Sequence, residues 1–171
     1  MNAIKYLLPV FILFTTSIQA KGVYLSTNDF LAESFNHQQP ALETLWLGKA
    51  HKLTAAKIMN RPVNSLRVRY WKLGNRTAWI LEEIGKELPI TIGIVIDSDR
   101  IHKVEILEYR ESRGGEVRYP AFRKQFINGK LDENYRLNSK IDGITGATLS
   151  VRAVTRTANL ALYYHKQALA Q

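Results

Sequence analysis

The sequence contains no cysteine, and this absence excludes several kinds of site. Without thiols the chain forms no disulfide, holds no zinc or iron–sulfur cluster through sulfur, and attaches neither haem nor a lipid anchor covalently. The four histidines are scattered, without the HxxxH spacing or the carboxylate cluster of a metal site. GxSxG, GxGxxG and P-loop motifs are also missing, so the sequence carries no fingerprint of a serine hydrolase, a nicotinamide-binding fold or a nucleotide hydrolase.

Long apolar runs are scarce, and the one at the start of the sequence is typical of a secretory signal. Lys5 precedes the apolar segment 6–14 (YLLPVFILF), and the SIQA that ends at Ala20 is a suitable cleavage site. The apolar segment is shorter than the ~20 residues of a membrane-spanning helix. We therefore predict a signal peptide over 1–20 and one domain over 21–171, in the periplasm or another extracytoplasmic compartment. An uncleaved anchor, which would keep the protein at the membrane, is the alternative.

Acidic residues are the scarcer charged class, since 15 Asp and Glu stand against 24 Lys and Arg, a formal net charge of +9. The basic residues are spread along the chain without a run of five or six, and an exported protein does not meet the usual nucleic-acid partners. We therefore predict no nucleic-acid partner. The charge fits attraction to anionic lipid or to an acidic redox partner, or simply a solvated basic surface.

Apolar periodicity predicts an α+β fold, a single domain in which helices pack against an antiparallel sheet. Alternating segments on both sides of Gly74-Asn75 predict a hairpin. The continuous apolar run PITIGIVI predicts a buried central strand. In the stretch that follows the last strand, Tyr119, Phe122 and Phe126 lie at i, i+3 and i+7 and predict an amphipathic helix with Pro120 in its first turn. The expected strands are 41–47, 66–70, 76–81, 89–96 and 101–109, and the other expected helices are 26–35, 48–59 and 149–167.

The stretch IDGITGATLS (141–150) places small residues beside two threonines, directly before the last predicted helix. A helix start presents unpaired backbone N–H groups and the positive end of the dipole, and Gly143 and Gly146 permit backbone angles that other residues resist. These features favour a phosphate group with a bulky attachment, within reach of the Thr148 hydroxyl and of Arg152 at i+4. On composition alone, an ordinary helix N-cap at Thr148 explains the same residues.

The motif resembles the flavinylation motif of the FMN-binding domain family, an Asp followed by Ser/Thr-Gly-Ala-Thr. That family includes the C subunit of the sodium-translocating NADH:quinone oxidoreductase and the G subunit of the Rnf complex. Segments 67–97 and 108–126 also look like small exported FMN-binding proteins of proteobacteria, so the resemblance covers most of the predicted domain.

The resemblance implies that Thr148 carries FMN covalently, through a phosphoester that a Mg-dependent flavin transferase installs from FAD. Asp142, Thr145, Gly146 and Ala147 occupy the other matching positions, and Thr145 stands where Ser is common. No other cofactor and no metal site is expected.

Two further groups of residues are candidates for contact with the flavin. In the loop RESRGGE, Arg110, Glu111 and Arg113 are predicted to line the flavin, while the two glycines admit backbone N–H groups to its carbonyls; the alternative is a charged surface loop. Trp71 and Trp79 flank the hairpin turn and have the ring faces to stack on a flavin, but aromatic residues on strands belong more often to the core.

These features predict an exported electron-transfer flavoprotein, a redox module that exchanges electrons with a partner protein, either soluble or membrane-bound, and no stand-alone enzyme. One alternative is a flavin-dependent reductase that acts on a small acceptor docked against the loop arginines. Another is a non-redox binding protein that has kept the fold and lost the flavin. Visible absorbance distinguishes the last of these from the others, and turnover without a partner distinguishes the reductase.

Overall fold

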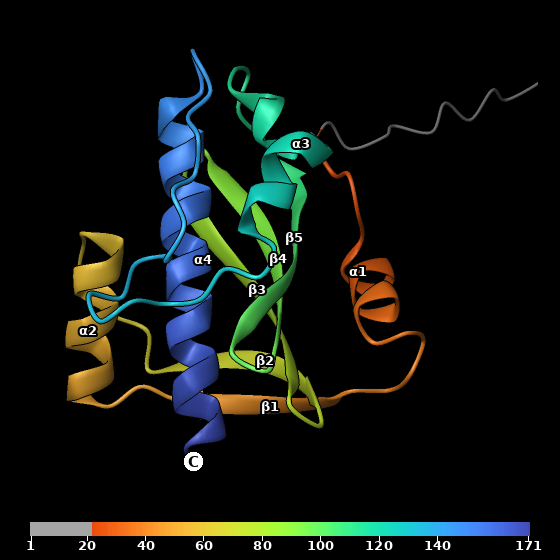
Figure 1. Cartoon of the computed structure of the whole chain (residues 1–171), viewed down its shortest axis with the longest axis vertical. Helices are drawn as coiled ribbons and strands as arrows, with labels where there is room; N and C mark the ends of the chain where they lie inside the picture. The colour runs from red at the N-terminus through yellow and green to blue at the C-terminus, as the bar shows by residue number, and fades with distance from the viewer. Residues whose placement is uncertain (1–21) are drawn as a thin grey trace, which may run out of the picture.

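A five-stranded antiparallel sheet separates two layers of helices in the computed structural model, which describes residues 22–171 (Figure 1). Each strand pairs with the next one along the chain, in the order β1-β2-β3-β4-β5, so the sheet is a simple meander. The predicted signal peptide (1–20) lies outside the described residues. The α+β prediction is confirmed, and so are the expected strands, which are β1 (Ala41–Trp46), β2 (Arg67–Leu73), β3 (Arg76–Ile84), β4 (Pro89–Asp97) and β5 (Arg100–Tyr109).

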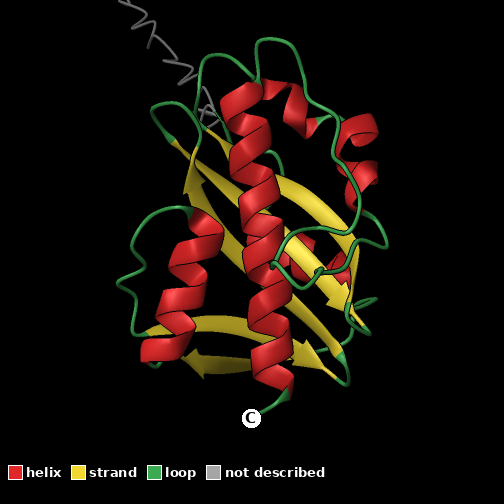
Figure 2. Cartoon of the chain, turned by 60° about the vertical axis from the view of Figure 1, so that its left-hand side comes forward, coloured by secondary structure: helices red, strands yellow, loops and turns green. Residues whose placement is uncertain are grey.

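The longest helix, α4 (Thr148–Leu169), lies across one face of the sheet with α2 (Lys49–Met59) beside it (Figure 2). The buried face of α4 includes Val151, Val154 and Ala158, which belong to the main hydrophobic core. Strand β4 is buried along almost its whole length, as its apolar run predicts. This packing fixes the axis of α4, and therefore the position of its first residue, relative to the strands.

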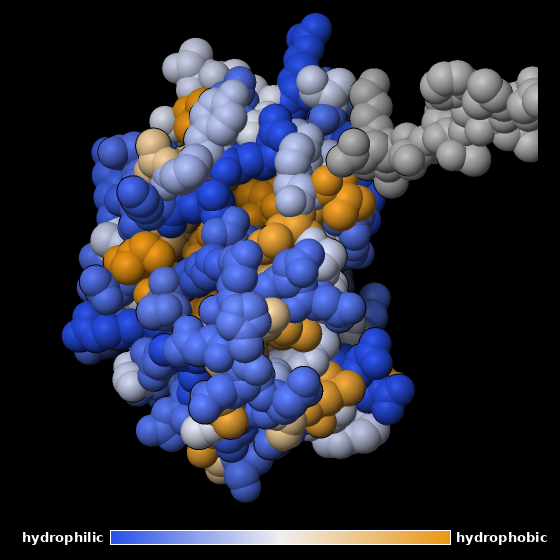
Figure 3. Space-filling model, turned by 90° about the vertical axis from the view of Figure 1, so that its right-hand side faces the viewer, coloured by the Kyte–Doolittle hydropathy of each residue, from blue (hydrophilic) through white to orange (hydrophobic). Residues whose placement is uncertain are grey.

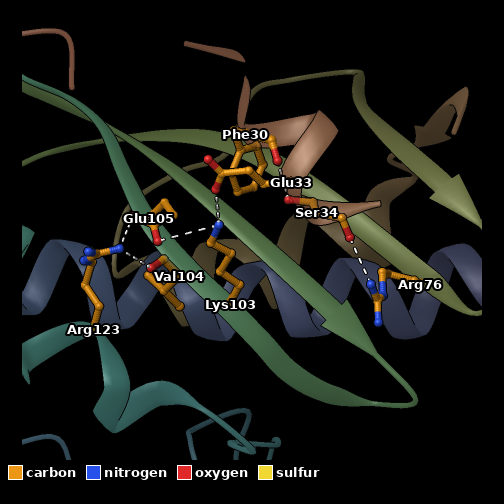
Figure 4. Close-up of polar contacts among 8 residues, drawn as sticks. All are labelled: Phe30, Glu33, Ser34, Arg76, Lys103, Val104, Glu105 and Arg123. Atoms are coloured by element: carbon orange, nitrogen blue, oxygen red, sulfur yellow. Dashed lines mark hydrogen bonds and ion pairs between the residues drawn. The ribbon is translucent and has the colours of Figure 1, made fainter. Parts of the chain in front are cut away.

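The opposite face of the sheet is covered by α1 (Thr27–Ser34), which Ser26 caps through its side chain. The ring of Phe30 lies over Gly93, where an added Cβ would come within 2.7 Å of the ring. Polar contacts hold the same helix at two points (Figure 4): Lys103 Nζ lies 2.6 Å from a Glu33 carboxylate oxygen, and Arg76 donates a 3.0 Å hydrogen bond to the carbonyl of Ser34. On this side of the molecule, exposed apolar atoms form separate patches among hydrophilic ones (Figure 3).

The segment after β5 differs from the single amphipathic helix that its periodicity predicts. It consists of a 3-10 turn, the short α3 (Pro120–Arg123) and a second 3-10 turn. Tyr119 has an extended backbone and is 58% exposed. A proline disfavours the helical conformation for the residue before it, so a new helix begins at Pro120 instead. Phe122 and Phe126 are buried as expected, with their rings edge to face at 5.4 Å. Within residues 22–171, none of the helices combines the length and the hydrophobicity that crossing a bilayer requires.

A buried histidine near the end of α4 makes the stability of the fold sensitive to pH. His165 is 1% exposed, its Nδ1 lies 2.7 Å from Thr77 Oγ1, and its Nε2 has no hydrogen-bond partner. Burial lowers the pKa of His165, and the nearby carboxylates of Asp99 and Asp97 oppose this effect only in part. The folded state therefore favours the neutral ring.

We expect the free energy of unfolding to fall as the pH drops below about 6.5, the pKa of an unfolded histidine, towards the lower pKa of folded His165. His165→Gln removes this titration and should flatten that part of the profile, as measured by urea unfolding at pH 7.5 and pH 5.5. His102→Gln, which changes an exposed histidine of β5, is the matched control for the loss of an imidazole. An equal slope in His165→Gln and the parent protein would contradict the assignment.

Candidate functional site

The first residue of α4 is Thr148, an exposed residue whose side chain carries a hydroxyl. Ala147 occupies the N-cap position, and no side chain there accepts a hydrogen bond from the N–H groups of the first turn. The interpretation of Thr148 as the N-cap is therefore wrong. Because a helix start without a side-chain cap leaves its N–H donors available, α4 keeps the anion-binding character of its N-terminus.

The glycines before α4 leave open space beside the main chain. Gly146 has a left-handed backbone (φ +82), which disfavours any residue with a Cβ, and an added Cβ would meet no atom within 4 Å. Gly143 has the same open surroundings without the positive φ. A bulky group therefore has room next to the backbone at the start of α4.

A cleft of about 560 Å³ brings the start of α4 together with the loop after β5 and the turn between β3 and β4. Arg113 and Lys86 supply positive charge, and the exposed Lys86 is paired with Glu87 at 3.1 Å. Thr148 and Ser112, which both carry hydroxyls, also line this cleft. The lining residues are Lys86, Glu87, Glu111, Ser112, Arg113, Gly146, Ala147, Thr148, Leu149 and Ser150.

Glu111 anchors the loop to the neighbouring turn. One of its carboxylate oxygens accepts hydrogen bonds from three consecutive backbone N–H groups, those of Lys86 (2.5 Å), Glu87 (2.6 Å) and Leu88 (3.0 Å). Partial desolvation tends to raise the pKa of Glu111, but these donors and the Lys86 ammonium outweigh it and hold the pKa below its usual value. The Glu111 carboxylate thus holds the loop after β5 against the β3–β4 turn through these backbone hydrogen bonds.

A second anchor joins the loop to α4 itself. The hydroxyl of Tyr109 donates to the carbonyl of Arg113 (2.5 Å) and lies 2.9 Å from Ser150 Oγ. Gly114 has φ +78, and an added Cβ would lie 2.8 Å from Ser150 Oγ and 3.0 Å from the Tyr109 hydroxyl. Because Gly114 has no Cβ, the loop can approach α4 this closely. Sequence reasoning missed the contact because Tyr109 and Ser150 belong to separate motifs.

Two of the predicted arginines lie outside this cleft. Arg110 donates hydrogen bonds to the Pro89 carbonyl and Thr91 Oγ1, each at 3.1 Å, and pairs with Glu108. Arg152 follows Thr148 by one turn but lines a neighbouring cleft. Of the three arginines predicted to reach the flavin, the structure brings only Arg113 to the cleft that contains Thr148.

The other predicted residues divide in a similar way. Gly146 and Ala147 line the cleft, whereas Asp142 and Thr145 are exposed beside it, and the Asp142 N–H donates to Gln125 Oε1 at 2.8 Å. Trp79 is fully buried and stacks on Tyr70 with ring centroids 4.6 Å apart, so its assignment to the core is confirmed. Trp71 packs, partly buried, against the smaller core beneath α1.

Residues 85–163 match the sequence model of the FMN-binding domain. The matched span begins in the turn that Glu111 anchors and ends within α4. It therefore contains every lining residue of the cleft, including Thr148.

Proposed function

We propose that the protein is an exported electron carrier with FMN esterified to Thr148. The domain that matches the FMN-binding family makes it a flavin-binding protein with FMN as its cofactor. The observation that carries this proposal is the Thr148 hydroxyl, exposed on the first residue of α4, in a cleft inside the matched span. A flavin transferase would catalyse the attachment. In that reaction Thr148 Oγ1 loses its proton and gains a bond to the FMN phosphorus of FAD, while AMP leaves.

The residues around Thr148 suit a phosphate with a bulky attachment. The uncapped N–H groups of the first turn of α4 favour an anion, and Arg113 adds positive charge across the cleft, whereas Lys86 is paired with Glu87. The open space beside Gly143 and Gly146 admits the larger part of the group. When bound, FMN supplies reversible uptake of one or two electrons.

A carrier that works outside the cytoplasm benefits from a covalent bond, because a freely exchanging flavin would be lost by dilution. The bond also removes the need for a deep pocket, so a shallow cleft on a small domain is sufficient. Leu149 and Leu88, which are 45% and 44% exposed, offer apolar surface at and beside the cleft for contact with a redox partner. The proposed partner is a protein, either soluble or bound to the membrane.

Arg113 is expected to tune the flavin, because positive charge near the ring favours the reduced form, which tends towards an anion. Arg113→Ala should therefore lower the midpoint potential, by about 30 mV for each ~1.4 kcal/mol of stabilisation lost in a two-electron couple. Redox titration against the parent protein measures the shift, with Arg69→Ala, an exposed arginine on β2, as the control. A shift no larger than that of the control would place the ring away from this loop.

Denaturing gel electrophoresis tests the proposed attachment. Protein expressed with a flavin transferase should give a fluorescent band at its own mobility after boiling in detergent, because a phosphoester survives unfolding. Fluorescence that runs only at the dye front would show a dissociable flavin instead. Steady turnover of a small acceptor by the purified protein alone would favour the reductase interpretation over the carrier.

A further inference from the structure

A second cleft, of about 550 Å³, lies farther along α4 and shares no residue with the cleft at Thr148. Its walls come from the C-terminal end of α2, the N-terminal half of α4 and the loop that leads to α4, which reaches across to α2 in Figure 1. The lining residues are Lys57, Ile58, Asn60, Asn134, Tyr135, Arg136, Leu137, Ser139, Ile141, Val151, Arg152, Thr155, Arg156 and Asn159. We call it the cation cleft, for the four charged residues of this set.

The charged residues of the cation cleft are all positive. Lys57 comes from α2, Arg136 from the loop, and Arg152 and Arg156 from successive turns of α4, while no Asp or Glu lines the cleft. Among residues 22–171, none of these four side chains forms an ion pair within 4.0 Å. Like charges at i and i+4 of a helix repel each other, so Arg152 and Arg156 destabilise α4 unless an anion lies between them.

Internal hydrogen bonds hold the loop wall of the cation cleft in place. Asn159, which is 8% exposed, accepts a 3.1 Å hydrogen bond from the Leu137 N–H and so ties the loop to α4. The carboxylate of Asp132 accepts from the N–H groups of Asn134 and Arg136, both at 2.8 Å, and is therefore engaged by its own backbone. Four cationic residues therefore line a concavity whose loop wall is held by internal hydrogen bonds.

Tyr135 supplies an aromatic surface in the same wall. Its backbone is left-handed (φ +60), an uncommon conformation for a residue with a large side chain. Its ring packs edge to face on Tyr163 at 5.5 Å, and Lys57 Nζ lies 5.9 Å from the ring centroid. The loop thus holds an aromatic ring beside the cations, in a cleft whose volume is typical of small-ligand sites.

We infer that the cation cleft binds a small phosphate-bearing anion, such as a diphosphate or a phosphate ester, at a site separate from that of the flavin. A phosphate concentrates two negative charges on one small group, and the planar forks of Arg136 and Arg156 suit its oxygens. An acidic protein segment distributes single charges along an extended chain and suits a broad face better than this concavity. This inference goes beyond the proposed electron transfer and does not depend on Thr148.

Calorimetric titration of the full domain with inorganic pyrophosphate, at low and at moderate salt, tests the inference. We expect one site per chain and an affinity about tenfold weaker in Arg136→Gln and in Arg156→Gln, each of which removes one charge-assisted contact. Arg69→Gln makes the same charge change on an exposed arginine of β2 and should bind like the parent protein. Circular dichroism checks that each variant is folded. If Arg156→Gln is unstable, Arg136→Gln still tests the inference, because Arg136 lies on an exposed loop.

Three results would overturn the inference. The first is no binding of pyrophosphate by the parent protein. The second is equal weakening in Arg69→Gln, which would show attraction to a basic surface without a defined site. The third is stronger binding of a ten-residue polyglutamate peptide, lost in Arg136→Gln, which would assign the cleft to an acidic protein segment.

Discussion

Thr148→Ala is expected to abolish the covalent flavin while leaving the domain folded. The substitution removes the only atom at this position that can carry the ester, and alanine is at least as favourable in a helix as threonine. Because no side-chain cap is lost with Thr148, we expect the free energy of unfolding to change by less than about 0.5 kcal/mol. The mass of the protein and its in-gel fluorescence measure the adduct, and urea unfolding measures the fold.

Thr27→Ala is the matched control for this experiment. Thr27 is also an exposed threonine at the first position of a helix, α1, but it lies outside the FMN-binding match. The control should keep the full adduct. An adduct that persists in Thr148→Ala and disappears in another hydroxyl variant would move the attachment to a different residue.

Gly114→Ala should have the second-largest effect, because two costs coincide at this position. The left-handed backbone (φ +78) costs about 1–2 kcal/mol for a residue with a Cβ. In addition, the new Cβ would lie 2.8 Å from Ser150 Oγ, so the hydroxyl must turn away from Tyr109 and lose a hydrogen bond of about 0.5–1.5 kcal/mol. We expect the free energy of unfolding to fall by roughly 1.5–3.5 kcal/mol in total.

Gly74→Ala separates these two costs. Gly74 also has a positive φ (+59), but an added Cβ there would meet no atom within 4 Å. Gly74→Ala should therefore cost only the backbone strain, about 1–2 kcal/mol. Urea unfolding of both variants, purified without flavin, measures the difference. Equal losses at the two glycines would mean that the loop after β5 does not depend on its close contact with α4.

The sequence was sufficient for most of the fold because its signals are local. The alternation around Gly74, the apolar run of β4 and the apolar face of α4 each specify an element without reference to the rest of the chain. The break at Tyr119 is the exception. The prediction followed the i, i+3, i+7 spacing of the aromatic residues, but in the structure Pro120 keeps the residue before it out of the helix.

The site was less predictable because its geometry depends on contacts between distant segments. Thr148 could be identified from its motif, but the role of Glu111 became clear only from the backbone N–H groups of the β3–β4 turn, more than twenty residues away. Arg152 shows the same limit. Its spacing from Thr148 predicts a shared ligand, yet Arg152 lines the cation cleft, together with residues of α2 and of the loop before α4.

The mass of the intact mature protein, purified from an exporting host that has a flavin transferase, tests the central claim most directly. We predict the mass of the chain from Lys21 plus FMN less one water, with the added mass on the proteolytic peptide that contains Thr148. An unmodified chain under these conditions would contradict covalent attachment, and an adduct on any other peptide would contradict the assignment to Thr148.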